Sequence, residues 1–167
     1  MARALGAPLD VVVARKIGMP GQPEYAIGAV AEGTDGAVLH HRPEDVQLSR
    51  ERFTRAIDDA IVEVRRRVER YRGGRSLPDL ASRTAVLVDD GLATGATAEA
   101  AIAAARGLHA EEVVVAVPVG AGDTVERLSE LATVVCLSTP ERFTAVGLWY
   151  DDFAQTTDAE VLALLGR

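Results

Sequence analysis

Short apolar runs alternate with helical segments through the second half of the chain, and this alternation constrains the fold more than any other feature. Residues 84–88, 113–117 and 133–137 are apolar runs of the kind that form strands buried on both faces. Helices are expected between them, at the alanine-rich 97–108 and at 123–131. Apolar strands that alternate with helices predict an α/β fold, with a mostly parallel central sheet and helices on both faces.

The first half of the chain predicts a smaller region built around one long helix. Apolar residues recur every three or four positions over 50–71, with Ser49 as the N-cap and Gly73 as the stop. A C-terminal helix is expected to open with a capping box of Thr157 and Glu160. Strands are expected at 9–14, 26–31 and 37–40, and a loop at the Gly- and Pro-rich 18–23.

Composition and charge narrow the classes of protein to consider. The 167 residues are 48% hydrophobic and 26% charged, which suits one globular domain over 1–167. The net charge of −7 argues against bulk binding to nucleic acid or to an anionic membrane. No run approaches the roughly 20 apolar residues of a membrane span, and no signal-like region follows Met1. We expect a cytoplasmic protein with no nucleic-acid or membrane partner, in which Cys136 is a buried small hydrophobe.

Chemistry-bearing residues follow the strand expected at 84–88, at the sheet edge where open α/β folds bind ligands. Asp89 and Asp90 are adjacent carboxylates that repel each other, so they make sense as acceptors for the hydroxyls of a ligand. The segment behind them offers free N–H groups at a helix start and two hydroxyls, from Ala93, Thr94, Gly95, Ala96 and Thr97. Such a helix start suits a phosphate monoester, and both features together fit one ribose 5-phosphate.

Residues 86–97 resemble the phosphoribosyl diphosphate signature of type I phosphoribosyltransferases, apart from Gly91, where the family usually has an aliphatic residue or Ser. The resemblance implies the family's fold, including a small hood-like region that would hold the long helix. It implies that Asp89 and Asp90 hold the ribose hydroxyls and that 93–97 bind the 5′-phosphate. It also implies Mg²⁺ that is carried by the substrate near the two acids, without direct protein ligands.

Two further segments resemble parts of the same family. Arg15 and Lys16, the latter the single lysine of the chain, resemble the start of a mobile loop whose cation reaches the pyrophosphate. The resemblance therefore assigns Arg15 and Lys16 to stabilising the leaving group. Near the C-terminus, Phe143, Trp149 and Tyr150 are candidates for stacking on a base, with packing in the core of the tail as the alternative.

The resemblance covers most of the chain and extends to a bacterial group of phosphoribosyltransferases. One family feature is not expected here, because only eight residues precede Leu9: the first strand and its pyrophosphate loop. The sheet edge that they would leave open favours a homodimer. His40 and His41 have no paired Cys or acid at ligand spacing, so a loop role is favoured over metal binding.

The resemblance implies transfer of ribose 5-phosphate from Mg-phosphoribosyl diphosphate to a nitrogen acceptor, with release of pyrophosphate. The acceptor stays open, although Ala93 disfavours the hypoxanthine-guanine subclass, which carries an Asp there. Two alternatives also stay open. One is a non-catalytic module that binds a phosphoribosyl metabolite or nucleotide. The other is an RNA-binding regulator, supported only by the arginine-rich stretch at 65–75.

Overall fold

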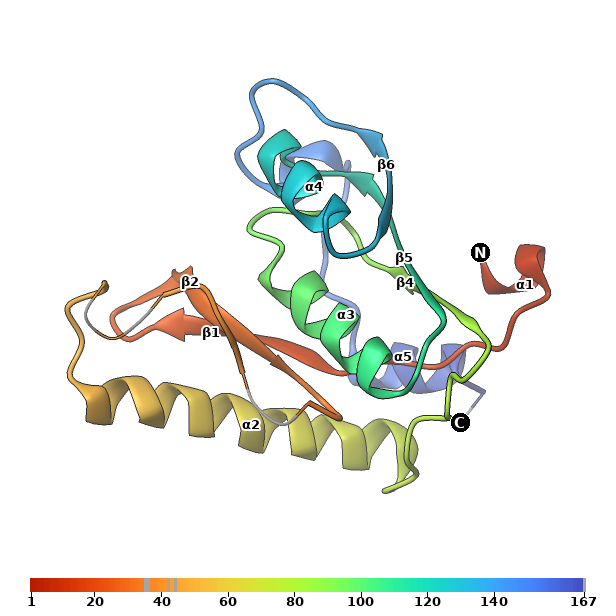
Figure 1. The fold of residues 1–167 in the computed structure, drawn as a ribbon, viewed down its shortest axis with the longest axis horizontal. Coiled ribbons are helices and arrows are strands. Elements are labelled where there is room, and N and C mark those ends of the chain that lie inside the picture. Colours follow the sequence, from red (N-terminus) through yellow and green to blue (C-terminus); the bar gives the residue numbers. More distant parts are fainter. Residues whose placement is uncertain (35–36, 42, 44, 167) are drawn as a thin grey trace.

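The computed structural model describes residues 1–34, 37–41, 43 and 45–166, which form two three-stranded sheets and their helices (Figure 1). The helices are α1 (Ala2–Leu5), α2 (Arg50–Arg72), α3 (Ala96–Gly107), α4 (Gly122–Ser129) and α5 (Asp158–Leu164), with the 3₁₀ helix η1 (Val146–Trp149) before α5. The strands are β1 (Ala14–Met19), β2 (Gln22–Ala31), β3 (Val38–Leu39), β4 (Thr84–Val88), β5 (Glu112–Val119) and β6 (Thr133–Ser138). The first sheet is antiparallel, in the order β1-β2-β3, and the second is parallel, in the order β4-β5-β6.

The helix α3 lies between the two sheets, so that the molecule is layered as α2, antiparallel sheet, α3 and parallel sheet (Figure 1). One face of the antiparallel sheet packs against α2 through large side chains such as Ile17, Ile27 and Phe53. The other face packs against α3 almost entirely through alanines, at Ala29, Ala31, Ala96, Ala100 and Ala104. Because alanine carries one methyl group, the hairpin backbone can lie close to the first turns of α3.

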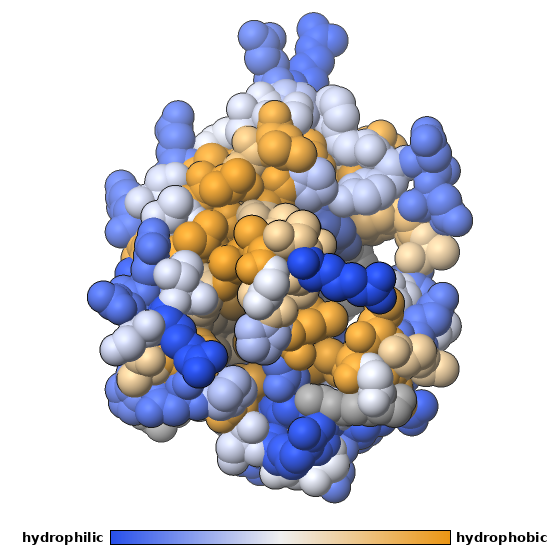
Figure 2. Space-filling view, turned by 90° about the vertical axis from the view of Figure 1, so that its right-hand side faces the viewer, coloured by the Kyte–Doolittle hydropathy of each residue, from blue (hydrophilic) through white to orange (hydrophobic). Residues whose placement is uncertain are grey.

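The parallel sheet and its flanking helices confirm the α/β class expected from the sequence. The helices α3 and α4 cover one face of this sheet, with Ile102 and Leu128 fully buried against it. Side chains that point to the other face remain exposed, at Val86, Val88, Val135 and Leu137. Figure 2 looks at this side of the molecule and shows a broad hydrophobic area there. Among the described residues, no helix combines the length and apolar character that crossing a membrane requires.

The long helix α2 begins and ends close to where its sequence pattern predicts. Ser49 caps its start by accepting a hydrogen bond from the amide of Arg52, and Gly73 ends it with a left-handed φ of 59°. Glu63 accepts hydrogen bonds from Arg66 (2.7 Å) and Arg67 (2.9 Å), which lower its pKa to about 2. Part of the arginine-rich stretch is therefore paired within the helix itself.

A buried ion pair joins the end of α2 to the residues before β1. The guanidinium of Arg72 contacts the carboxylate of Glu32, and both side chains are almost fully buried. Arg72 also donates to the Val11 carbonyl (2.8 Å), while Glu32 accepts from the Val13 amide (2.7 Å). Since each charge has several polar partners, the pair satisfies backbone groups that a sheet ladder would otherwise satisfy.

This ion pair explains why the strand expected at 9–14 is wrong. The strand β1 begins only at Ala14 and continues through Gly18 and Met19, where a loop was expected. Residues 11–13 are an apolar run without ladder partners, because side chains of Arg72 and Glu32 take their backbone groups instead. Cys136 lies in β6 as expected but is only partly buried.

Candidate active site

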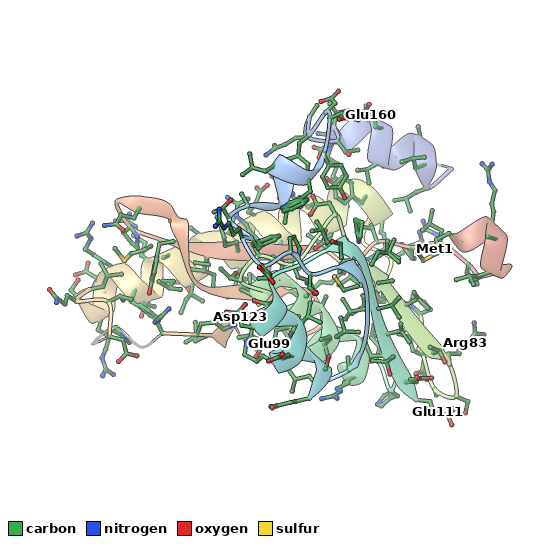
Figure 3. The ribbon with its side chains drawn as sticks, turned by 90° about the horizontal axis from the view of Figure 1, so that it is seen from above. Met1, Arg83, Glu99, Glu111, Asp123 and Glu160 are labelled. Carbon is green, nitrogen blue, oxygen red and sulfur yellow. The ribbon has the colours of Figure 1, made fainter. Side chains whose placement is uncertain are left out.

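The acid pair Asp89 and Asp90 lies directly after β4, at the carboxyl edge of the parallel sheet. The Asp89 amide donates to the Ala116 carbonyl of β5 (3.4 Å), and the Asp90 amide donates to Asp89 Oδ1 (2.9 Å). Neighbouring protein atoms partly desolvate both carboxylates and raise the pKa of each; the nearby charge of Asp90 adds to the rise at Asp89. Arg83 and Glu111 mark the opposite edge of the sheet in Figure 3. The two acids therefore remain open to solvent in a site that disfavours unpaired negative charge.

Behind the acids, the chain is held by a short parallel bridge to the end of β5. The Leu92 amide donates to the Val119 carbonyl (2.9 Å), and the Leu92 carbonyl accepts from Ala121 (2.8 Å). A Cβ placed on Gly91 would lie 2.8 Å from Val146 of η1 and 2.9 Å from the Val119 carbonyl oxygen. The glycine that departs from the usual family pattern is thus required by the close approach of η1.

The phosphate-loop candidate, residues 93–95, is fastened to α4 through its carbonyl groups. Thr124 Oγ1 donates to the Ala93 carbonyl (2.7 Å), and Arg127 Nη2 donates to the Thr94 carbonyl (2.7 Å). Gly95 adopts a left-handed φ of 73° as α3 begins. The loop therefore turns its carbonyl side toward α4.

The amide side of the same loop faces the other way. The Ala96 amide lies 3.5 Å from the Thr94 hydroxyl, which is a marginal local contact. Within the described ranges, no acceptor is found for the amides of Thr94, Gly95 or Thr97. These donors sit at the start of α3, where the helix dipole also favours an anion.

The C-terminal segment reaches the acid pair through one aromatic residue. The Tyr150 hydroxyl donates to the Asp90 carbonyl (2.7 Å), and burial together with the charges of the two acids raises its pKa. The Tyr150 ring lies 5.2 Å from that of Phe153. Of the other two stacking candidates, Trp149 lies in η1 and is about half exposed, and Phe143 is partly buried. Neither of these two is joined to the acid pair by a hydrogen bond in the described part of the chain.

Arg15 and Lys16 lie inside the antiparallel hairpin, on opposite faces of β1. Arg15 Nη1 lies 4.0 Å from Glu63 of α2. Lys16 pairs across the ladder with Ala29, and paired residues of an antiparallel sheet share a face. Ala29 packs against Ala96 in the first turn of α3, so Lys16 belongs to the face that meets the phosphate-loop candidate. The structure therefore separates two residues to which the sequence assigns one role.

Sequence reasoning missed three side chains behind the loop. Glu99 Oε2 accepts a hydrogen bond from Arg127 Nη1 (2.7 Å) and lies 3.0 Å from His40 Nε2. Neither Glu99 nor Arg127 belongs to a recognisable motif, and His40 was expected in a loop role. No group of three or more His, Cys, Asp or Glu that could hold a metal ion occurs among the residues described.

The comparisons with known proteins agree with the geometry of this edge. Residues 1–151 match the phosphoribosyl transferase domain family. The chain belongs to this family. Two Mycobacterium tuberculosis proteins, from strains CDC 1551 / Oshkosh and H37Rv, carry the provisional name of phosphoribosyl transferase. Each is 48% identical over 172 residues, which cover 100% of this phosphoribosyl transferase domain and 38% of the relative.

A solved structure supports the same assignment. The crystal structure of TT1426 from Thermus thermophilus is 45% identical, with a TM-score of 0.74, over 98% of this domain and 78% of that chain. The phosphoribosyl transferase domain thus spans about two fifths of the length of the curated relatives it matches.

Proposed function

We propose that residues 1–167 form one phosphoribosyltransferase domain that transfers ribose 5-phosphate from Mg-phosphoribosyl diphosphate to a nitrogen acceptor. The observation that carries this proposal is the orientation of residues 93–95. Their carbonyls are bonded to α4, and their amides are left for a ligand at the edge where Asp89 and Asp90 present carboxylates. A phosphate group and a pair of ribose hydroxyls need these two kinds of partner, a few residues apart.

In this reaction Asp89 and Asp90 accept hydrogen bonds from the 2′- and 3′-hydroxyls of ribose. The amides of the loop, with the hydroxyls of Thr94 and Thr97, donate to the 5′-phosphate. The bond between C1′ and the pyrophosphate oxygen breaks, and the electron pair leaves with pyrophosphate. A bond forms between C1′ and the acceptor nitrogen, whose proton passes to solvent. The protein contributes position and charge stabilisation, which suit an oxocarbenium-like transition state.

The acid pair fits the Mg²⁺ that the family implies. Carboxylate oxygens are ligands that Mg²⁺ accepts, and this ion usually keeps waters and substrate oxygens rather than sitting in a protein cage. Both acids have raised pKa values from desolvation, which a nearby cation would offset. Bound Mg²⁺ would supply neutralisation of pyrophosphate charge. Asp89 and Asp90 would orient the hydroxyls that share its coordination.

For the leaving group, Lys16 is better placed than Arg15. It belongs to the hairpin face that meets the start of α3, whereas Arg15 reaches toward Glu63 on the opposite face. For the acceptor, Tyr150 is the stacking candidate nearest the acids, because its hydroxyl is bonded to Asp90. Phe143 and Trp149 remain base-stacking predictions.

The test is calorimetric titration of the protein with phosphoribosyl diphosphate and Mg²⁺, followed by assays of pyrophosphate release with a panel of nitrogen bases. Binding with release supports the transferase, and binding without release supports the non-catalytic module. Asp89→Asn with Asp90→Asn should abolish binding. A matched control is Glu111→Gln with Glu112→Gln, an adjacent acid pair at the opposite edge of the sheet. If the Asn variant binds as tightly as the wild type, the site is wrong.

The homodimer and the cytoplasmic location stay predictions. A second copy would suit the β4 edge, which pairs with no further strand in the described residues. Sedimentation velocity over a range of protein concentrations tests the dimer, and a single monomer species throughout would reject it.

A further inference from the structure

The loop that would bind the 5′-phosphate depends on Arg127, a residue of α4 that lies behind it. The guanidinium divides its two terminal nitrogens between two acceptors. Nη2 donates to the Thr94 carbonyl, and Nη1 donates to Glu99 Oε2, both at 2.7 Å. A Cβ added to Gly95 would come within 3.1 Å of Nη2, so the guanidinium lies directly under the loop.

Holding a carbonyl also fixes the amide that belongs to the same peptide unit. The peptide is planar and trans, so its C=O and N–H point in opposite directions. Arg127 holds the Thr94 carbonyl toward α4 and thereby turns the Gly95 amide away from it. Thr124 does the same for the Ala93 carbonyl and the Thr94 amide. Two side chains of one helix therefore determine the direction of two anion-binding donors.

The carboxylate of Glu99 would otherwise oppose this arrangement. It lies in the first turn of α3, next to the position of an incoming phosphate, and like charges repel. Arg127 and His40 both contact Glu99 Oε2, at 2.7 Å and 3.0 Å. Figure 3 shows Glu99 beside the start of α4, which Asp123 marks. Glu99 thus anchors Arg127, and His40 adds a contact from the end of β3 in the antiparallel sheet.

We propose that Arg127 and Thr124 are positioning residues for 5′-phosphate binding, and that Glu99 and His40 hold Arg127 in place. They set the direction of the loop amides without touching the substrate. The inference rests on the proposed function, because it concerns the phosphate of the same substrate. It predicts a selective effect: affinity for the phosphorylated pentose depends on these side chains, and affinity for pyrophosphate does not.

The experiment compares the binding of ribose 5-phosphate and of pyrophosphate with Mg²⁺ by calorimetry. Arg127→Met and Thr124→Val should each weaken ribose 5-phosphate binding by about tenfold, because each frees one peptide unit to rotate. Arg127→Lys should have an intermediate effect, since one ammonium cannot reproduce the two-pronged contact. Pyrophosphate affinity should stay within about twofold of wild type in all three. Arg106→Met is the matched control, because Arg106 also binds a backbone carbonyl, that of Leu131, at the far end of α3.

The outcomes separate this inference from the proposed function. If the wild type binds no ribose 5-phosphate, the proposed function fails and takes the inference with it. If the wild type binds it and both Arg127→Met and Thr124→Val bind equally well, only the positioning role is overturned. Parallel loss of affinity for both ligands would indicate general damage and would also overturn the role. Should Arg127→Met fail to fold, the nearly isosteric Thr124→Val decides the question alone.

Discussion

Replacing Gly95 with Ala should destabilise the protein more than the same change at another left-handed glycine. Gly95 has φ of 73°, which L-residues with a Cβ rarely adopt. Its added Cβ would lie 2.7 Å from Thr124 Cγ2 and 3.1 Å from both Arg127 and Leu128. Gly33 has nearly the same φ of 71°, yet nothing lies within 4 Å of its added Cβ. The two glycines thus share the backbone cost and differ in the contact cost.

The magnitudes follow from these two costs. The left-handed conformation costs an L-residue roughly 1–2 kcal/mol, and this applies to both variants. Crowding in a packed region adds about 1–3 kcal/mol, and this applies to Gly95→Ala alone. The loss of unfolded-state entropy on changing Gly to Ala is common to both and cancels in the comparison. Gly95→Ala should therefore unfold with a free energy about 1–3 kcal/mol lower than Gly33→Ala.

Urea unfolding of both variants, followed by fluorescence of the single tryptophan Trp149, measures this difference. Equal losses of stability would refute the reasoning, because they would mean that the loop relaxes away from α4 at no cost. Ribose 5-phosphate binding by the folded variants is the companion measurement. Gly95→Ala should weaken it, since the added methyl pushes on Thr124 and on the carbonyl bond that Thr124 makes. Gly33→Ala should leave it unchanged.

Three further changes test other parts of the structure. Asp89→Asn with Asp90→Asn should raise the free energy of unfolding at pH 7, because the raised pKa values mean that ionising these acids destabilises the folded state; the gain should vanish near pH 3, where both states are protonated. Glu63→Gln should cost less than about 1 kcal/mol at pH 7, and urea unfolding should show the difference disappearing as pH falls from 4.5 to about 2, since arginines of α2 hold the pKa of Glu63 at about 2. Arg72→Met should cost about 3–5 kcal/mol in the same assay, because it leaves Glu32 buried without its partner; a loss under about 1 kcal/mol would show that the pair contributes little.

Elements whose signals are local were predicted well from the sequence. The helix expected at 50–71 is α2, because apolar spacing, a serine cap and a left-handed glycine all act within the segment itself. The capping box of Thr157 and Glu160 is present at the start of α5 for the same reason. The strand expected at 84–88 is β4 with the same bounds. In each case the determining contacts join residues only a few positions apart.

Elements that depend on distant partners were predicted less well. The valines at 11–13 have the composition of a buried strand, yet their backbone groups are bonded to Arg72 and Glu32. Arg72 is 61 residues away from Val11, and nothing in either segment indicates the pairing. The hairpin that forms instead carries Lys16 and Arg15 on opposite faces, so one dipeptide was assigned a single role that the sheet divides.

The candidate site combines both situations. The sequence predicts which donors residues 93–97 contain, because glycine, threonine and a helix start are visible in the letters. It does not predict which way the donors face, since a small flexible loop can present either side of its peptide units. That direction is set by Thr124 and Arg127, 31 and 33 residues beyond the carbonyls they hold. Substitutions in α4 should therefore alter phosphate binding while the recognisable motif stays intact, and a search for the motif alone would not detect the loss.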